Sequence, residues 1–262
     1  LGDVGVGGDY SSKTSGTSNL RLGVNAGNSI ASGGNFNTFV GDEAGTAITT
    51  GDNNVAVGFE ALSTEDANSF NTALGYRALK TLNAGSDSYN TAIGADAGLS
   101  ITTGLYNNLI GGLAGDAITT GDENIAIGVN SLTAETAGNK SIAIGGGTLA
   151  AQNSSSDTDM FNTAVGYHAG LSVTTAIKNT LIGGIAGDAL NTGSFNVAVG
   201  MQALSADTKG AKNVAIGQGA LEAQNFTSAT DSYNTAVGHP AGLSVTTGVA
   251  NTIIGGLAGD AL

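Results

Sequence analysis

Hydrophobic and polar residues along this chain follow a phrase of five positions that recurs about every 17 residues. The phrase is typified by Asn90–Gly94, which spells Asn-Thr-Ala-Ile-Gly. Across fourteen copies, position 1 is Asn in all but one, position 4 is always aliphatic and position 5 is always Gly. Short segments rich in β-branched residues and followed by Gly predict a strand that ends in a turn.

The regular spacing of the phrase predicts the architecture. One supersecondary unit repeated at a fixed period is typical of a solenoid, in which each coil buries the face that its neighbour exposes. The density of Gly and the lack of a 3.6-residue period exclude helix. We therefore predict an all-β fold: a parallel β-solenoid of about 14–15 coils of about 17 residues, forming one continuous array over residues 1–262. Stacking should align the Asn residues of position 1 in a ladder of side-chain amides.

A longer period of four coils overlies the short one. Four residues after the closing glycine, the chain alternates in pairs between Gly and Leu, as at Gly98, Gly115, Leu132 and Leu149. The fourth coil of each block carries an insertion, and the first repeats, over residues 1–33, are the most degenerate. Insertions in repeat proteins form loops on one face, which is often the binding face.

Three insertions supply the candidate recognition residues. They cover Asn83–Tyr89, Asn153–Phe161 and Asn225–Tyr233, are rich in Ser, Asp and Thr, and end in an aromatic residue. Hydrogen-bonding groups beside an aromatic ring suit weak contacts with cell-surface glycans; the alternative is that the loops are inert surface bulges. The candidate surface-recognition residues are Asn83, Asp87, Tyr89, Asn153, Asp157, Phe161, Asn225, Asp231 and Tyr233.

Positions 3 and 4 of the phrase are both apolar. Neighbouring residues of a strand point to opposite faces, so the strand should be buried on both sides. We expect the position-4 aliphatics to fill the coil and the small residues of position 3 to pack against another chain of a homo-oligomer. The alternative is a second layer within one chain. The residues expected at the contact are Ala92, Ala126, Ala164, Ala198 and Ala236.

Composition removes several classes of function. The formal net charge is −13, with eight Lys and Arg residues, which argues against binding to nucleic acid. No apolar run reaches the roughly 20 residues of a membrane span, so we expect no membrane insertion. With no Cys and two His residues, we expect no metal site of the His/Cys type and no cofactor. Whether calcium binds at the acidic turns stays open: Asp42, Glu43 and Asp52 lie near turns, but Asp116 and Asp188 recur only every fourth coil, too far apart to share an ion.

The run from Asn90–Gly94 through Asn234–Gly238 resembles the head repeats of trimeric autotransporter adhesins. It is also similar to the repeat arrays of phage tail fibres, as in Asn196–Gly200 followed by Ala203-Leu204. The resemblance covers about residues 19–262. It implies a left-handed β-roll, three chains sharing an axis, and a place outside the cell or on the virion surface. Coils of adhesin heads are usually shorter than 17 residues, which favours the fibre shaft.

These observations predict a structural protein and not an enzyme. We expect a rigid segment of a longer fibre or adhesin, a homotrimer whose loops contribute to attachment at a host surface. Two alternatives stay open. A glycan-processing tail spike would place catalytic carboxylate pairs across chains. An ice-binding β-solenoid would use the recurring Thr-Thr pairs, such as Thr102-Thr103 and Thr119-Thr120.

Overall fold

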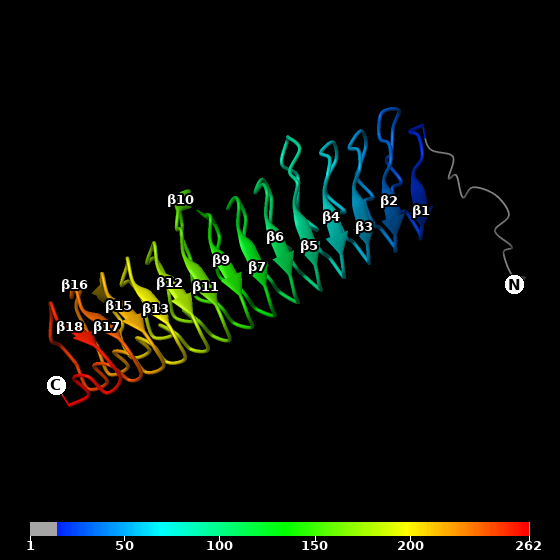
Figure 1. Ribbon diagram of the computed structural model, residues 1–262. Helices are drawn as coiled ribbons and strands as arrows, with labels where there is room; N and C mark the ends of the chain where they lie inside the picture. The colour runs from blue at the N-terminus through cyan, green and yellow to red at the C-terminus, as the bar shows by residue number, and fades with distance from the viewer. Residues whose placement is uncertain (1–14, 262) are drawn as a thin grey trace, which may run out of the picture.

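A computed structural model describes residues 15–261 of the chain as one straight β-solenoid (Figure 1). One sheet of fourteen parallel strands forms a wall along its length, and the described residues contain no helix. The strands of this wall are β1 (Leu20–Leu22), β2 (Thr38–Val40), β3 (Val55–Val57), β4 (Thr72–Leu74), β5 (Thr91–Ile93), β6 (Asn108–Ile110), β7 (Ile125–Ile127), β9 (Ile142–Ile144), β11 (Thr163–Val165), β12 (Thr180–Ile182), β13 (Val197–Val199), β15 (Val214–Ile216), β17 (Thr235–Val237) and β18 (Thr252–Ile254).

Each phrase pairs in register with the next. Ala92 of β5, for example, lies opposite Leu109 of β6, which lies opposite Ala126 of β7. Thirteen such steps at about 4.8 Å make the wall about 62 Å long. The predicted all-β solenoid is confirmed, and its left hand stays a prediction. Of the degenerate repeats predicted over residues 1–33, residues 1–14 lie outside the described part of the chain.

The structure reverses the predicted inside and outside of the strands. Position 3 faces the interior: Ala92, Ala126 and Ala164 are fully buried within a single chain. Position 4 faces outward, where Ile110 and Ile182 are 37% and 39% exposed. The predicted contact of the alanine face with another chain is therefore wrong, since no partner can reach it. The coil is thin, so the inner side of the strand has room only for a small residue opposite the turn. This explains why position 3 is usually Ala.

Four more strands of two residues each form in the insertions and beside them. They are β8 (Gly138–Asn139), β10 (Thr158–Asp159), β14 (Gly210–Ala211) and β16 (Thr230–Asp231). β10 pairs with β8 and β16 with β14, both in parallel. Figure 1 shows β10 at the edge of the rod where the strands of the main sheet begin. The second and third insertions are thus held to the rod by backbone hydrogen bonds.

The Asn ladder is present, but its partners are mainly backbone atoms. The side-chain Oδ1 of Asn90 accepts a hydrogen bond from the N–H of Asn107 at 2.8 Å. Its Nδ2 donates to the carbonyl oxygen of Gly104, also at 2.8 Å. Asn107 repeats both bonds, to Asn124 and to Gly121. Each buried amide therefore satisfies one donor and one acceptor of the next coil, which explains why Asn recurs where burial of an unpaired group is costly.

Two features of the backbone require Gly at the closing position of the phrase. At Gly128 the backbone φ is +135°, a conformation that side chains disfavour. A Cβ placed there would also lie 2.5 Å from the carbonyl oxygen of Gly145 in the next coil. Only Gly allows the backbones of successive coils to approach this closely.

The four-coil period comes from how the interior is filled. In two coils of each block, Leu132 and Leu149 reach inward from the turn and face the alanines of the strand wall. In another coil, Leu109 of the strand wall fills the space instead, opposite Gly115. A Cβ at Gly115 would lie 2.9 Å from Leu109 Cδ2, so the glycine makes room for the leucine.

The leucines of the turn pay a conformational cost. Leu132 and Leu149 have φ near +54° and +49°, in the left-handed region. That conformation costs a non-glycine residue about 1–2 kcal/mol. Burying a leucine side chain contributes about 1.5–3 kcal/mol, which outweighs the strain.

Three carboxylates are buried beneath the leucine turns: Glu65, Glu135 and Asp207. Oε1 of Glu135 accepts hydrogen bonds from four backbone N–H groups, including those of Gly138 and Ser154. Its Oε2 accepts one from Gln152 Nε2 at 2.8 Å. These bonds compensate for burial of a charge without a cation. At Glu65, burial nevertheless raises the pKa above its ordinary 4.5, against the lowering effect of hydrogen bonds from Asn68 and its neighbours.

Candidate functional site

The edge of the rod where the strands begin carries the most varied side chains. The residue before each position-1 Asn has a positive φ, and most of these side chains are exposed. We call this row the edge column. Within the regular coils it consists of Phe36, Asn53, Phe70, Tyr89, Tyr106, Glu123, Lys140, Phe161, Lys178, Phe195, Lys212, Tyr233 and Ala250.

Three successive rings in the N-terminal half of the edge column form an aromatic stack. The ring centroids of Phe70 and Tyr89 are 4.9 Å apart and nearly parallel, and those of Tyr89 and Tyr106 are 5.7 Å apart. Because the spacing of the coils brings the rings face to face, each covers a face of the next. Their edges and the Tyr hydroxyls, rather than open ring faces, are available to a ligand.

The C-terminal half alternates lysines with rings. The Nζ atoms of Lys140, Lys178 and Lys212 lie 5.0–5.5 Å from the ring centroids of Phe161, Phe195 and Tyr233. Contacts of this kind contribute about 0.5–1 kcal/mol each at exposed sites. The edge column therefore changes along the rod from aromatic to mixed cationic and aromatic.

The first insertion places its three predicted residues on the surface. Asn83, Asp87 and Tyr89 are all exposed. Oδ1 of Asp87 accepts a hydrogen bond from the N–H of Ser69 at 3.1 Å, and Tyr89 takes part in the aromatic stack. At least two of the three side chains thus hold the loop against the rod.

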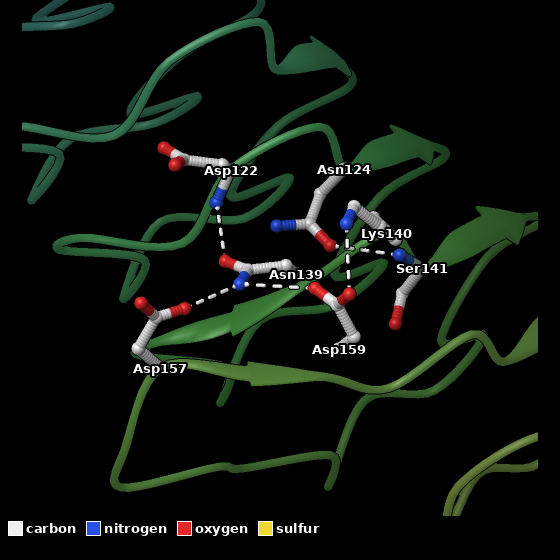
Figure 2. A network of polar contacts seen from close by, with 7 residues as sticks. All are labelled: Asp122, Asn124, Asn139, Lys140, Ser141, Asp157 and Asp159. Carbon is white, nitrogen blue, oxygen red and sulfur yellow. Dashed lines mark hydrogen bonds and ion pairs between the residues drawn. The ribbon is translucent and has the colours of Figure 1, made fainter.

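The second insertion places Asn153, Asp157 and Phe161 on the surface and ties Asp157 into a polar network (Figure 2). Nδ2 of Asn139 donates to Asp157 Oδ1 at 2.6 Å, and Oδ1 of Asn139 accepts from the N–H of Asp122 at 2.9 Å. Asn139 therefore joins the inserted loop to the coil before it.

An ion pair completes this network. Lys140 Nζ lies 2.8 Å from Asp159 Oδ2, in reach of the solvent. This contact lowers the pKa of Asp159 and raises that of Lys140. Burial raises the pKa of Asp122, and the nearby charges of Asp157 and Glu123 act in the same direction. Four carboxylates around one lysine make the second loop acidic.

The third insertion has the same pair in a different setting. Asn225, Asp231 and Tyr233 are exposed. Lys212 Nζ lies 2.6 Å from Asp231 Oδ2 and 3.0 Å from the Tyr233 hydroxyl. Both contacts raise the pKa of Lys212.

A groove of about 510 Å³ opens beside the third loop. Its lining includes Phe195, Lys209, Lys212, Thr230 and Asp231. Of these, only Asp231 was predicted from the sequence. Phe195 and Lys212 belong to the edge column, whose repeated place before Asn was the signal that could have revealed them. Lys209 stands on an adjacent coil and carried no such signal.

A second groove, of about 440 Å³, lies on the turn side of the rod. It is lined by Asp188, Gln202, Ser205 and Glu222, among others. Oδ1 of Asp188 is buried without a hydrogen-bond partner, and burial raises the pKa of this carboxyl group. The described residues contain no group of three or more His, Cys, Asp or Glu side chains arranged to hold a metal ion.

The paired threonines considered for ice binding lie on coils stacked along the rod. The hydroxyl of Thr119 donates to the carbonyl oxygen of Thr136 at 2.9 Å, and that of Thr102 donates to Thr119 at 3.1 Å. The first hydroxyl of each of these two pairs thus links one coil to the next, whereas Thr103 and Thr120, the second members, are exposed.

Comparison with protein families, with curated proteins and with solved structures finds no match for this chain. Within residues 15–261, no helix is long and apolar enough to cross a membrane.

Proposed function

We propose that this chain is a rigid, non-enzymatic segment of an extracellular or virion-borne fibre, in which copies of the chain pack through the outer face of the main sheet. The outer face consists of positions 2 and 4 of the fourteen phrases. One observation carries the proposal. Position 4 is aliphatic in every copy although it points away from the coil's own interior.

The chemistry of the outer face supports self-association. Position 2 is Thr, Val or Ile in all copies except Leu20 and Asn108, so neither row contains a charged residue. Two outward side chains per strand cover a width of about 10 Å, which over about 62 Å gives roughly 600 Å². Seven of the fourteen position-2 residues are Thr, so the face is uncharged but not wholly apolar; its area equals the upper end of the range for the largest apolar patch on a typical monomer. Two copies would together bury about 1,200 Å², the lower limit of a stable interface.

The backbone supports the role of a shaft. Every strand of the wall except the first and last pairs with a neighbour on each side, so hydrogen bonding continues without a hinge from β1 to β18. Such a rod suits the task of holding a binding element away from a surface. The resemblance to trimeric adhesins and tail fibres leads us to expect three chains in the assembly.

The test is the mass of the protein in solution. Ile110→Glu and Ile182→Glu would each bury an unpaired charge in every copy of the interface, at a cost of several kcal/mol. Light scattering at micromolar concentration should give an oligomer, a trimer by our expectation, for the native chain and a monomer for the double variant. A second double variant, Ser155→Glu with Ser156→Glu, adds the same two charges to exposed residues of the second loop and should leave the oligomer intact.

Circular dichroism should show the same β content for all three proteins, because Ile110 and Ile182 do not pack inside the coil. A native chain that is monomeric at micromolar concentration would refute the proposal. So would a double variant at Ile110 and Ile182 that keeps the native mass.

A further inference from the structure

We propose that the groove beside the third loop binds an acidic saccharide through a uronic acid unit. The groove is the one of about 510 Å³ lined by Phe195, Lys209, Lys212, Thr230 and Asp231. Its volume falls in the range of pockets that hold small ligands. This inference goes beyond the shaft function and does not require the chains to associate.

The side chains that line this groove carry a net positive charge, opposite to that of the molecule, with Lys209 and Lys212 against Asp231. Lys178, Lys209 and Lys212 account for three of the eight basic residues in a chain of net charge −13. On the edge next to them, the third insertion contributes one carboxylate, Asp231. A local excess of cations on an acidic rod attracts an anion to this place and disfavours binding elsewhere.

Two lysines have different roles in the groove. Lys212 is held by Asp231 and by the Tyr233 hydroxyl, so its position is fixed and its charge is largely compensated. Lys209 Nζ forms no ion pair with any described residue. Lys209 is thus the group that would form a charge-assisted hydrogen bond with a ligand carboxylate.

Phe195 supplies the apolar surface that a sugar ring needs. It is 48% exposed, lies between Lys178 and Lys212 in the edge column, and lines the groove. The C–H groups on one face of a pyranose can pack on this ring, while the sugar hydroxyls reach Thr230 and Asp231. A uronic acid has both features that this groove would recognise: a carboxylate at one end and, next to it, an apolar face of C–H groups.

The second loop provides a matched comparison within the same chain. It keeps the Lys–Asp pair and the aromatic residue, as Lys140, Asp159 and Phe161. At the positions of Phe195, Lys209 and Ala229, 72 residues earlier, it has Glu123, Ala137 and Asp157. The same backbone therefore carries an acidic surface there, which should repel the ligand that the third loop attracts.

The test is a calorimetric or NMR titration of the whole chain with trigalacturonic acid. We expect binding at one place per chain with a Kd of about 1 mM or tighter. Lys209→Gln and Phe195→Ala should each weaken it at least about tenfold, and Lys140→Gln in the second loop should not change it. Neutral galactotriose should bind at least tenfold more weakly than the acid.

Variants at the third loop could lose binding because they misfold, so a second experiment creates a binding place instead of removing one. Replacing Asp122 by Ser, Glu123 by Phe, Ala137 by Lys, Asn139 by Ala and Asp157 by Ala gives the second loop the lining of the third groove, and should give two binding places per chain. Equal binding of the neutral trisaccharide would overturn the role of Lys209. Displacement by equimolar inorganic sulfate would show a general anion site, and unchanged binding by Lys209→Gln would place the ligand elsewhere. None of these results depends on the mass of the assembly, so this inference and the fibre proposal fail separately.

Discussion

The four-coil period is attributed to a large side chain that fills the coil either from the strand or from the turn. Moving the leucine of one coil from the strand, at 109, to the turn, at 115, tests this explanation. Leu109→Ala empties the interior and should cost about 2–5 kcal/mol of unfolding free energy. Gly115→Leu alone should cost a similar amount. Its side chain would overlap Ile118 and Leu109, at about 1–3 kcal/mol, and its positive φ adds about 1–2 kcal/mol.

The double variant, with Ala at 109 and Leu at 115, reproduces the pair Ala126 and Leu132, with Ile118 in the place that Glu135 takes in that coil. The side chain at 115 takes the space that Leu109 leaves, while the backbone strain and the close contact with Ile118 remain, so we expect a loss of about 1–3 kcal/mol. Simple addition of the single losses predicts at least about 4 kcal/mol. Guanidinium unfolding followed by circular dichroism, at one protein concentration because association shifts stability, measures all four proteins. A double variant as unstable as the sum of the two would refute complementary filling as the cause of the period.

Two further predictions concern the backbone and the buried acids. Gly128→Ala should lower the unfolding midpoint strongly, because its Cβ would meet the carbonyl of the next coil, whereas Gly112→Ala, whose nearest atom is 3.9 Å away, should change little in the same guanidinium titration. The folded state raises the pKa of Glu65, so this group contributes stability below about pH 4.5 that is lost as the pH rises. Glu65→Gln should remove that dependence, and equal slopes of midpoint against pH for both proteins would contradict it.

Periodicity alone is enough to predict the fold, because a strand repeated at one spacing can only stack in parallel. It is not enough to predict which face of each strand lies inside. In a three-residue strand with apolar residues at positions 3 and 4, both orientations bury one apolar row. The turn leucines decide the matter, since Leu132 fills the interior and leaves room for Ala126 but not for a larger residue. That relation depends on distances across the coil, which the sequence does not give.

The candidate site was predictable only in part. Insertions are visible in the sequence as added length, so the three loops could be located. The groove also needs Phe195 and Lys209, which lie outside any insertion and reach it because coils stack about 4.8 Å apart. Contact between side chains separated by one coil follows from register, and register at the edge is set by the pairing of β16 with β14.

The fourteen copies within this chain distinguish two kinds of exposed position. At the edge column, Phe, Tyr, Asn, Glu, Lys and Ala all occur, and the backbone keeps the same left-handed conformation. The coil therefore places no demand on that side chain, so its chemistry is free to serve recognition. Position 4 is also at the surface, yet it is aliphatic in every copy. The interior of a single coil cannot explain this, because the side chain does not enter it. A constraint that acts from outside the chain can explain why position 4 is always aliphatic. Packing against further copies along the whole rod would apply that constraint equally to each coil.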